Sequence, residues 1–143
     1  MPSVTISNPN LQIEGPIVEV QFLVSKELEA KLREENTPIP ASARVKALID
    51  TGASNCSVQE DIPQKLGLQP YDKILISTPS GNAECYRYFM RMLIPTHNII
   101  YEGMFTAVPG LIIQNIQCLI GRDLLSFSEF TYRGKQRQFT LTL

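Results

Sequence analysis

The chain has 143 residues, of which 43% are hydrophobic and 19% are charged, as in a folded globular protein and unlike a disordered chain. Thirteen basic and fourteen acidic residues give a formal net charge of −1, so no positive excess favours nonspecific binding to nucleic acid or to an anionic membrane. The length corresponds to one domain, and no apolar run approaches the roughly 20 residues needed to cross a bilayer. We therefore predict a single domain over residues 1–143.

The first part of the chain predicts two strands with a charged segment between them. Residues 17–24 and 44–49 are short apolar runs rich in β-branched residues. Between them, Ser25 is suited to cap a helix over residues 25–36, which carries i,i+4 pairs of opposite charge. We predict residues 25–44 as a charged insertion between the first strands, formed either by this helix or by a loop.

The rest of the chain predicts mainly strands. Apolar runs at residues 73–78 and 83–94 flank Pro-Ser-Gly-Asn, a strong turn sequence, and predict a long hairpin. Further strands are predicted at residues 99–108, 116–120, 129–132 and 136–143, and short helices at residues 61–66 and from residue 121. The fold class predicted is all-β, with one or two short helices.

The cysteines and the histidine limit the possible chemistry. Cys56, Cys85 and Cys118 are odd in number and form no Cys-x-x-Cys pair, which argues against a disulfide framework and against a zinc site. Free thiols favour a cytoplasmic location. Cys56 and His97 are the one nucleophile and base pair available for covalent hydrolysis, but no motif supports it, and a small buried side chain is the preferred interpretation of Cys56.

The sequence ALIDTGAS at residues 47–54 places a carboxylate directly after an apolar strand. Asp50 is expected at the end of that strand, partly withdrawn from water, and the Thr51 hydroxyl can fix the loop by hydrogen bonding. Gly52 permits a sharp turn and the close approach of a substrate. By itself the triplet also fits a strand that ends in an ordinary turn, so both interpretations remain open at this point.

A second motif, LIGRDLL, follows at residues 119–125. An apolar pair and a glycine precede Arg122 and Asp123, which open a helix. Taken in order, ALIDTGAS, the hairpin around PSGN and LIGRDLL resemble the retropepsins, the retroviral-type aspartic proteases and their cellular and bacterial relatives. The resemblance covers residues 45–143 and does not explain the charged insertion.

The resemblance implies a small closed β-barrel of the acid-protease type that forms a two-fold symmetric homodimer. Each chain would supply one catalytic aspartate, Asp50, because the chain has one Asp-Thr-Gly triplet and is too short for two lobes. A water held between the two carboxylates would hydrolyse a peptide bond in an extended segment, with no metal and no cofactor. The expected partners are a second copy of the chain and a protein or peptide substrate, with no nucleic acid and no membrane.

The resemblance also assigns roles to individual residues. Thr51 and Gly52 would support the active-site loop. The substrate-binding residues would be Gly52, Ala53, Leu119 and the flap tip Pro79, Ser80, Gly81 and Asn82. Gly121, Arg122 and Asp123 would be structural.

Two points stay open in the roles assigned to these residues. Leu119 fits plain core packing as well as a pocket, and the partner of Arg122 is undetermined, because Ser54 stands where viral members often carry an aspartate. The strand at residues 136–143 is the predicted dimer contact. The alternative function is a retropepsin-fold dimerisation or peptide-binding module with little or no cleavage.

Overall fold

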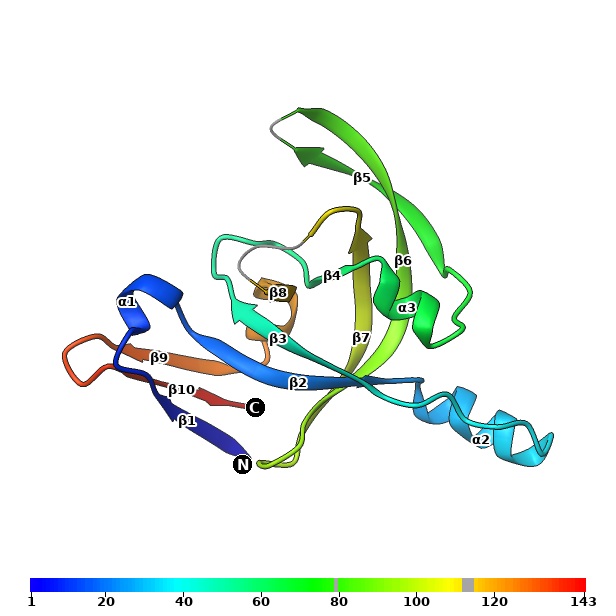
Figure 1. The fold of residues 1–143 in the computed structure, drawn as a ribbon, viewed down its shortest axis with the longest axis horizontal. Coiled ribbons are helices and arrows are strands. Elements are labelled where there is room, and N and C mark those ends of the chain that lie inside the picture. The colour runs from blue at the N-terminus through cyan, green and yellow to red at the C-terminus, as the bar shows by residue number, and fades with distance from the viewer. Residues whose placement is uncertain (79, 112–114) are drawn as a thin grey trace.

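The computed structural model describes residues 1–78, 80–111 and 115–143 of the chain (Figure 1). The structure is 49% strand and 16% helix, so the prediction of a mainly β protein is confirmed. The described residues contain four short helices, more than the one or two predicted. The elements are β1 (Ser3–Ser7), α1 (Leu11–Glu14), β2 (Ile17–Leu23), α2 (Lys26–Glu34), β3 (Ala43–Ile49), β4 (Ser57–Gln59), α3 (Asp61–Lys65), β5 (Asp72–Thr78), β6 (Gly81–Ile94), β7 (Ile99–Val108), β8 (Ile116–Ile120), α4 (Arg122–Leu125), β9 (Glu129–Arg133) and β10 (Gln138–Thr142).

The larger sheet closes on itself. Its strands follow the order β2-β3-β8-β4-β7-β6-β5, and β2 pairs in addition with β6. This extra pairing joins the ends of a run of six strands and leaves β5 outside, paired with β6 alone among the described strands. Alternate residues of the strands point inward and are buried. Phe22 of β2 and Phe105 of β7 pack edge to face in the core, with ring centroids 5.1 Å apart.

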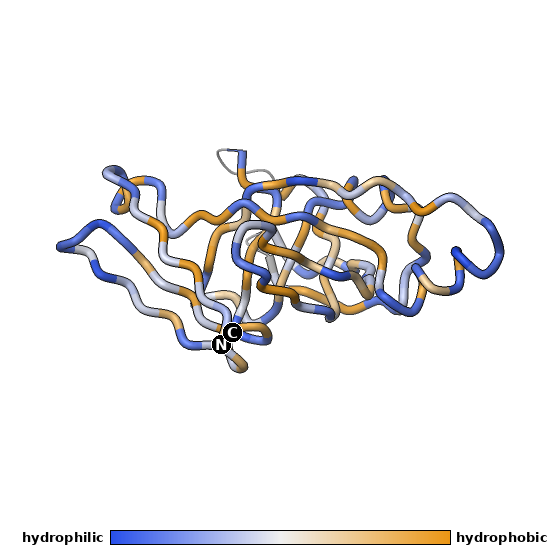
Figure 2. The backbone as a smooth tube through the Cα atoms, turned by 90° about the horizontal axis from the view of Figure 1, so that it is seen from below, coloured by the Kyte–Doolittle hydropathy of each residue, from blue (hydrophilic) through white to orange (hydrophobic). Residues whose placement is uncertain are grey.

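A second, three-stranded sheet brings the two ends of the chain together. β10 lies between β1 and β9, with Ser3 opposite Thr142. The Leu143 amide donates to the Pro2 carbonyl at 3.1 Å, and Figure 2 shows the termini side by side. Because both edges of β10 are paired within the chain, this strand has no free edge to add to the sheet of a second copy. The dimer contact predicted for residues 136–143 stays a prediction, and within this chain both edges of β10 are already paired.

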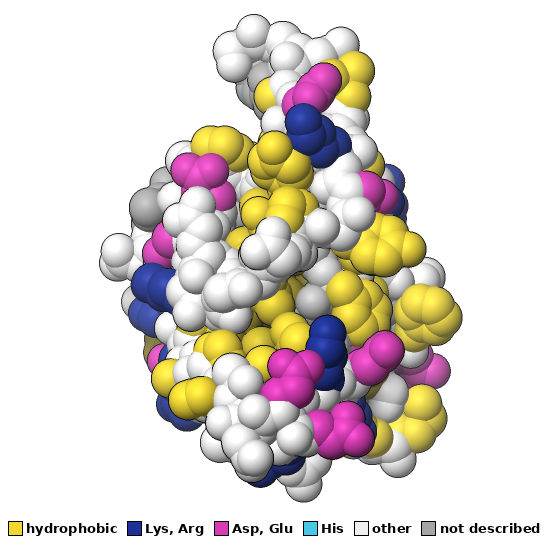
Figure 3. All heavy atoms as spheres, turned by 90° about the vertical axis from the view of Figure 1, so that its right-hand side faces the viewer, with side chains coloured by type: hydrophobic (Ala, Val, Ile, Leu, Met, Phe, Trp, Pro, Cys, Tyr) yellow, Lys and Arg dark blue, Asp and Glu magenta, His cyan; other side chains and the backbone are white. Residues whose placement is uncertain are grey.

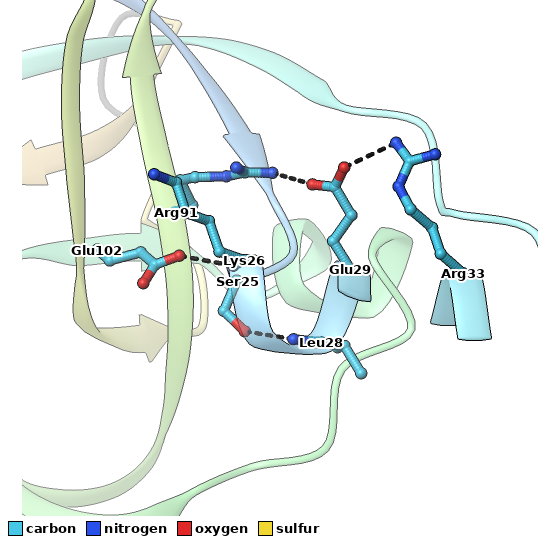
Figure 4. Close-up of polar contacts among 7 residues, drawn as sticks. All are labelled: Ser25, Lys26, Leu28, Glu29, Arg33, Arg91 and Glu102. Carbon is cyan, nitrogen blue, oxygen red and sulfur yellow. Dashed lines mark hydrogen bonds and ion pairs between the residues drawn. The ribbon is translucent and has the colours of Figure 1, made fainter. Parts of the chain in front are cut away.

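The charged insertion contains the predicted helix, α2, held by polar contacts. Ser25 caps it by accepting a hydrogen bond from the Leu28 amide at 3.2 Å, and no residue of the helix is buried. Arg91 of β6 donates to Glu29 at 2.5 Å, and the Lys26 amide donates to Glu102 of β7 at 2.6 Å (Figure 4). Hydrogen bonds from Arg33 and then Arg91 lower the pKa of Glu29. These contacts anchor α2 on the β6–β7 pair.

The β5–β6 hairpin projects from the barrel. It rises above the other strands in Figure 1, and Figure 3 shows it as a protrusion above a face where hydrophobic side chains gather between charged ones. Thr78 of β5 pairs with Gly81 of β6, and this is the pairing nearest the hairpin tip among the described residues. Gly81 has a φ of +119°, a conformation that favours glycine. At the base, Asp72 and Arg87 lie directly opposite each other and form a two-bond ion pair.

Candidate active site

Asp50 lies at the end of β3, as predicted. The strand before it is buried at Ala47 and Ile49 and pairs in parallel with β8. The Asp50 amide continues this ladder by donating to the Ile120 carbonyl at 2.9 Å. The backbone of Asp50 is thus fixed by the barrel, while its side chain is half-buried at the barrel end.

Gly52 holds the carboxylate of Asp50 in a defined position. Its amide donates to Oδ1 of Asp50 at 2.9 Å. A Cβ atom at Gly52 would lie 3.1 Å from the same oxygen, which is a tight contact. The Ala53 amide donates to the Asp50 carbonyl at 3.1 Å and closes the turn. A residue with a side chain at position 52 would crowd the carboxylate, which gives a physical reason for glycine here.

The second motif packs directly against this loop. The Arg122 amide donates to the Ala53 carbonyl at 2.8 Å, and the Asp123 amide donates to the Ser54 carbonyl at 3.2 Å. Gly121 approaches so closely that a Cβ atom there would lie 2.5 Å from the backbone of Asn55. The two motifs, far apart in the sequence, therefore form one unit at the barrel end.

The structure supplies the missing partner of Arg122. Its guanidinium Nη1 donates to the Thr51 carbonyl at 2.7 Å. Both residues are exposed, and they line a hollow beside the Asp50 loop. The remaining residues that line this hollow are Leu125, Ser126 and Phe130.

Asp123 and Cys56 form a contact that the sequence analysis missed. The Asp123 carboxylate accepts hydrogen bonds from the Cys56 amide, at 3.1 and 3.0 Å to its two oxygens, and from the Leu124 amide at 2.8 Å. It also accepts one from the Cys56 thiol, with Sγ 3.0 Å from Oδ1. The sequence gives one indication of this contact: Cys56 lies six residues after Asp50, and Asp123 lies at the start of a predicted helix.

The alternative chemistry built on Cys56 and His97 has no support in the structure. Cys56 is fully buried. Burial, together with the hydrogen bond to Asp123, raises the pKa of its thiol to about 12, so the reactive thiolate does not form near neutral pH. His97 lies exposed in the turn between β6 and β7, where its ring pairs with the Thr96 hydroxyl at 2.6 Å.

The predicted substrate-binding residues divide into two groups. Gly52 and Ala53 belong to the Asp50 loop, and Leu119 lies half-buried on β8 next to it, paired with Leu48 of β3. Ser80, Gly81 and Asn82 are exposed at the hairpin tip, on the upper side of the barrel in Figure 1, and Pro79 lies outside the described residues.

Within residues 1–78, 80–111 and 115–143, no group of three or more His, Cys, Asp or Glu side chains is arranged to hold a metal ion. In the same part of the chain, no helix has the length and apolar character needed to span a bilayer.

Comparisons with known proteins agree with the resemblance in the sequence. A family model described as aspartyl protease matches residues 39–124, which include both motifs. The comparison with curated proteins gives no match. Among solved structures, a retropepsin-like aspartic protease from Rickettsia conorii is similar over 97% of this chain and 89% of its own, with 16% identity and a TM-score of 0.56.

EIAV protease, solved in complex with the inhibitor HBY-793, is similar over 85% of this chain and 93% of its own, with 17% identity and a TM-score of 0.50. At these identities the two structures support the fold, while the family model covers more than half of the chain and includes the Asp50 loop. The chain therefore belongs to the aspartyl protease family and has a retropepsin-like fold.

Proposed function

We propose that this protein is a homodimeric aspartic endopeptidase in which each chain contributes one Asp50. The observation that carries the proposal is the position of Asp50 in the structure. Its carboxylate lies at the barrel end and accepts a hydrogen bond from the Gly52 amide at 2.9 Å. The loop that carries it is hydrogen-bonded to the LIGRDLL motif through the amides of Arg122 and Asp123. Membership of the aspartyl protease family supports the same chemistry.

The dimer follows from the need for two carboxylates. Hydrolysis by this route requires one carboxylate that takes a proton from water and one that gives a proton to the peptide carbonyl. The chain has one Asp-Thr-Gly triplet, so a second copy must supply the other aspartate. A two-fold axis between the two Asp50 residues gives an isologous interface, with the exposed Thr51 of each chain next to the axis.

The mechanism then follows from charge. Two carboxylates a few ångströms apart do not ionise together readily, so the pair shares one proton. The ionised member takes a proton from the water between them, and this water attacks the peptide carbonyl carbon. The protonated member donates to the carbonyl oxygen and afterwards assists departure of the amine. The pair must be singly protonated, so the rate should fall on both sides of an acidic optimum.

The substrate is proposed to be an extended polypeptide segment. It would lie between the Asp50 loop and the β5–β6 hairpin and would pair through its backbone, as an added strand does. Gly52, Ala53 and Leu119 would contact it from the barrel side, and the predicted flap residues 79–82 would contact it from the hairpin side. Three free cysteines, all buried, fit the proposed location in the reducing cytoplasm.

The test compares wild type with Asp50→Asn, an isosteric change that keeps an oxygen for the Gly52 amide. Both are incubated with a degenerate peptide library from about pH 3 to pH 7, and products are read by mass spectrometry. Asp61→Asn is the matched control, because Asp61 pairs with Lys65 on α3 at 3.1 Å, outside the proposed site.

Cleavage by wild type and Asp61→Asn, and none by Asp50→Asn, is the expected result. Equal cleavage by Asp50→Asn would overturn the assignment of Asp50. No cleavage by any of the three would overturn the endopeptidase and favour the alternative, a dimerisation or peptide-binding module. Sedimentation velocity on the same samples tests the dimer, and a cleaving protein that stays monomeric would contradict it.

A further inference from the structure

The thiol of Cys56 lies between two residues at the start of α4, Gly121 and Asp123. On one side, Sγ lies 3.0 Å from Oδ1 of Asp123 and donates to it. On the other side, it accepts a hydrogen bond from the Gly121 amide at 3.4 Å. The thiol therefore continues a chain of polar contacts from a backbone amide through sulfur to a carboxylate.

Water cannot take over the hydrogen bonds of this thiol, because the site is buried. Cys56 is fully buried and Gly121 is also buried. If the sulfur is removed, the Gly121 amide loses this acceptor, and the donors left to the Asp123 carboxylate among the described residues are the backbone amides of Cys56 and Leu124. A buried amide without an acceptor is unfavourable, so the local backbone is expected to move until the amide finds a new partner.

Three contacts would transmit such a movement from Gly121 to the backbone of Asp50. Gly121 lies against the backbone of Asn55, so neither segment can shift alone. The next residue, Arg122, donates from its amide to the Ala53 carbonyl at 2.8 Å. The Ala53 amide in turn donates to the Asp50 carbonyl at 3.1 Å.

We propose that Cys56 is a positioning residue for Asp50, and that its thiol acts through Asp123 and Gly121 to set the geometry of the catalytic loop. This role rests on the proposed endopeptidase function for its effect on rate, while the hydrogen bonds on which it depends can be tested without any activity. Its raised pKa keeps the thiol protonated across the working range of pH, so its hydrogen bond to Asp123 is always available.

Cys118 provides a matched control for simple loss of volume. It is as buried as Cys56. It lies on β8, and β8 pairs with β4, the strand that begins at the residue after Cys56. Cys56→Ala and Cys118→Ala remove the same atoms from the same core, but only the first removes a thiol that bridges Gly121 and Asp123. Cys56→Ser is the conservative variant, because a hydroxyl can also donate to the carboxylate and accept from the amide.

The first experiment measures amide hydrogen exchange by NMR and the S–H stretching band by Raman spectroscopy. We expect faster exchange at the Gly121 amide in Cys56→Ala, with Cys56→Ser and Cys118→Ala close to wild type. The wild-type spectrum should contain a band of a hydrogen-bonded thiol that disappears in Cys56→Ala. Two results would overturn the proposal that the thiol bridges Gly121 and Asp123. One is equal exchange of the Gly121 amide in the two alanine variants. The other is that the S–H band lost in Cys56→Ala lies at the frequency of a thiol without a hydrogen bond.

The second experiment measures kcat and KM on a peptide found by the library assay, with active sites counted by titration with pepstatin. Cys56→Ala should lower kcat roughly tenfold or more, because small displacements of reacting groups are costly, while KM changes little. Cys56→Ser should restore most of kcat, and Cys118→Ala should keep it. A wild-type kcat in Cys56→Ala, or an equal loss in Cys118→Ala, would overturn the positioning role. If wild type cleaves nothing, the endopeptidase fails, and exchange and Raman data still decide whether the thiol bridges.

Discussion

Arg122 donates a hydrogen bond from its guanidinium to the backbone carbonyl of Thr51, at 2.7 Å. Thr51 directly follows Asp50, so the arginine of the second motif holds the loop of the first motif from the solvent side. Its own amide holds Ala53 at the same time. One residue therefore fixes the Asp50 loop at two points, and this explains why an exposed arginine is needed at the start of α4.

Replacing Arg122 by alanine should lower the free energy of unfolding by about 1–2 kcal/mol, toward the low end for a hydrogen bond from a charged group, because Arg122 is exposed. The cleavage rate should fall by roughly tenfold or more, because the freed carbonyl lies next to Asp50. Thermal denaturation and the peptide assay measure the two effects. Arg44→Ala is the control, since Arg44 is exposed and its pair with Glu19 is 3.9 Å long. A similar loss of activity in both variants would contradict the role of Arg122.

Gly121→Ala should destabilise the fold by about 3 kcal/mol, because the new Cβ would lie 2.5 Å from the backbone of Asn55 and one segment would have to move. Gly134→Ala is the matched control, since its Cβ would meet Tyr132 at an ordinary 3.5 Å. Urea denaturation of both variants gives the comparison, and the control should stay within about 0.5 kcal/mol of wild type. Equal stability of the two variants would show that residues 121 and 55 are not in close contact.

The ion pair at the base of the hairpin should make the hairpin sensitive to acid. The hydrogen bond from Arg87 is the main cause that lowers the pKa of Asp72 from its ordinary value of 3.8. A lowered pKa means that the pair stabilises the hairpin above that ordinary value, and that this stabilisation is lost as the pH falls through the lowered pKa. Exchange of the Tyr71 amide, which donates to the Arg87 carbonyl at 2.7 Å, should then accelerate relative to the barrel amides.

Asp72→Asn should remove this acid dependence by loosening the hairpin base at every pH. Glu84→Gln is the control, because Glu84 is exposed and lies 3.9 Å from its partner Lys73. A wild-type acid dependence that persists in Asp72→Asn would show that another group controls the hairpin.

We predict that the hollow beside Thr51 forms part of the contact in the proposed dimer. Ser126→Lys adds bulk and charge to an exposed residue in this hollow, next to Arg122. Two-fold symmetry duplicates the added charge at the interface, so the dimer Kd should rise at least about tenfold. Ser42→Lys, at an exposed position before β3, is the control. Sedimentation velocity measures both, and an unchanged dimer in Ser126→Lys would place the contact elsewhere.

The parts of the fold that depend on local sequence were predictable. Asp50 follows an apolar run and precedes Thr51-Gly52, which identifies the end of a strand without knowledge of the neighbouring strands. Helix α2 carries its own cap at Ser25, and the β5–β6 hairpin has its own turn. In each of these cases the residues that decide the structure are close together in the chain.

Several contacts join residues that are far apart in the chain, and the sequence did not predict these contacts. β1 is a five-residue strand whose Val4 becomes buried when the strand pairs with β10 from the other end of the chain. β4 has three residues and exists because β7 and β8 pair with its two sides. The bond between Cys56 and Asp123 spans 67 residues. No local periodicity encodes such partners, so the support of the candidate site became visible only in the fold.

The pairing of β1 with β10 leaves the amino and carboxyl ends about one strand spacing, roughly 5 Å, apart. A short glycine-serine connector would therefore be enough to join Leu143 to Met1. New ends could then be opened in the turn at Gly134 without breaking either sheet. The same geometry means that this domain could be carried as an insertion in a surface loop of a host protein, because its two ends lie close together.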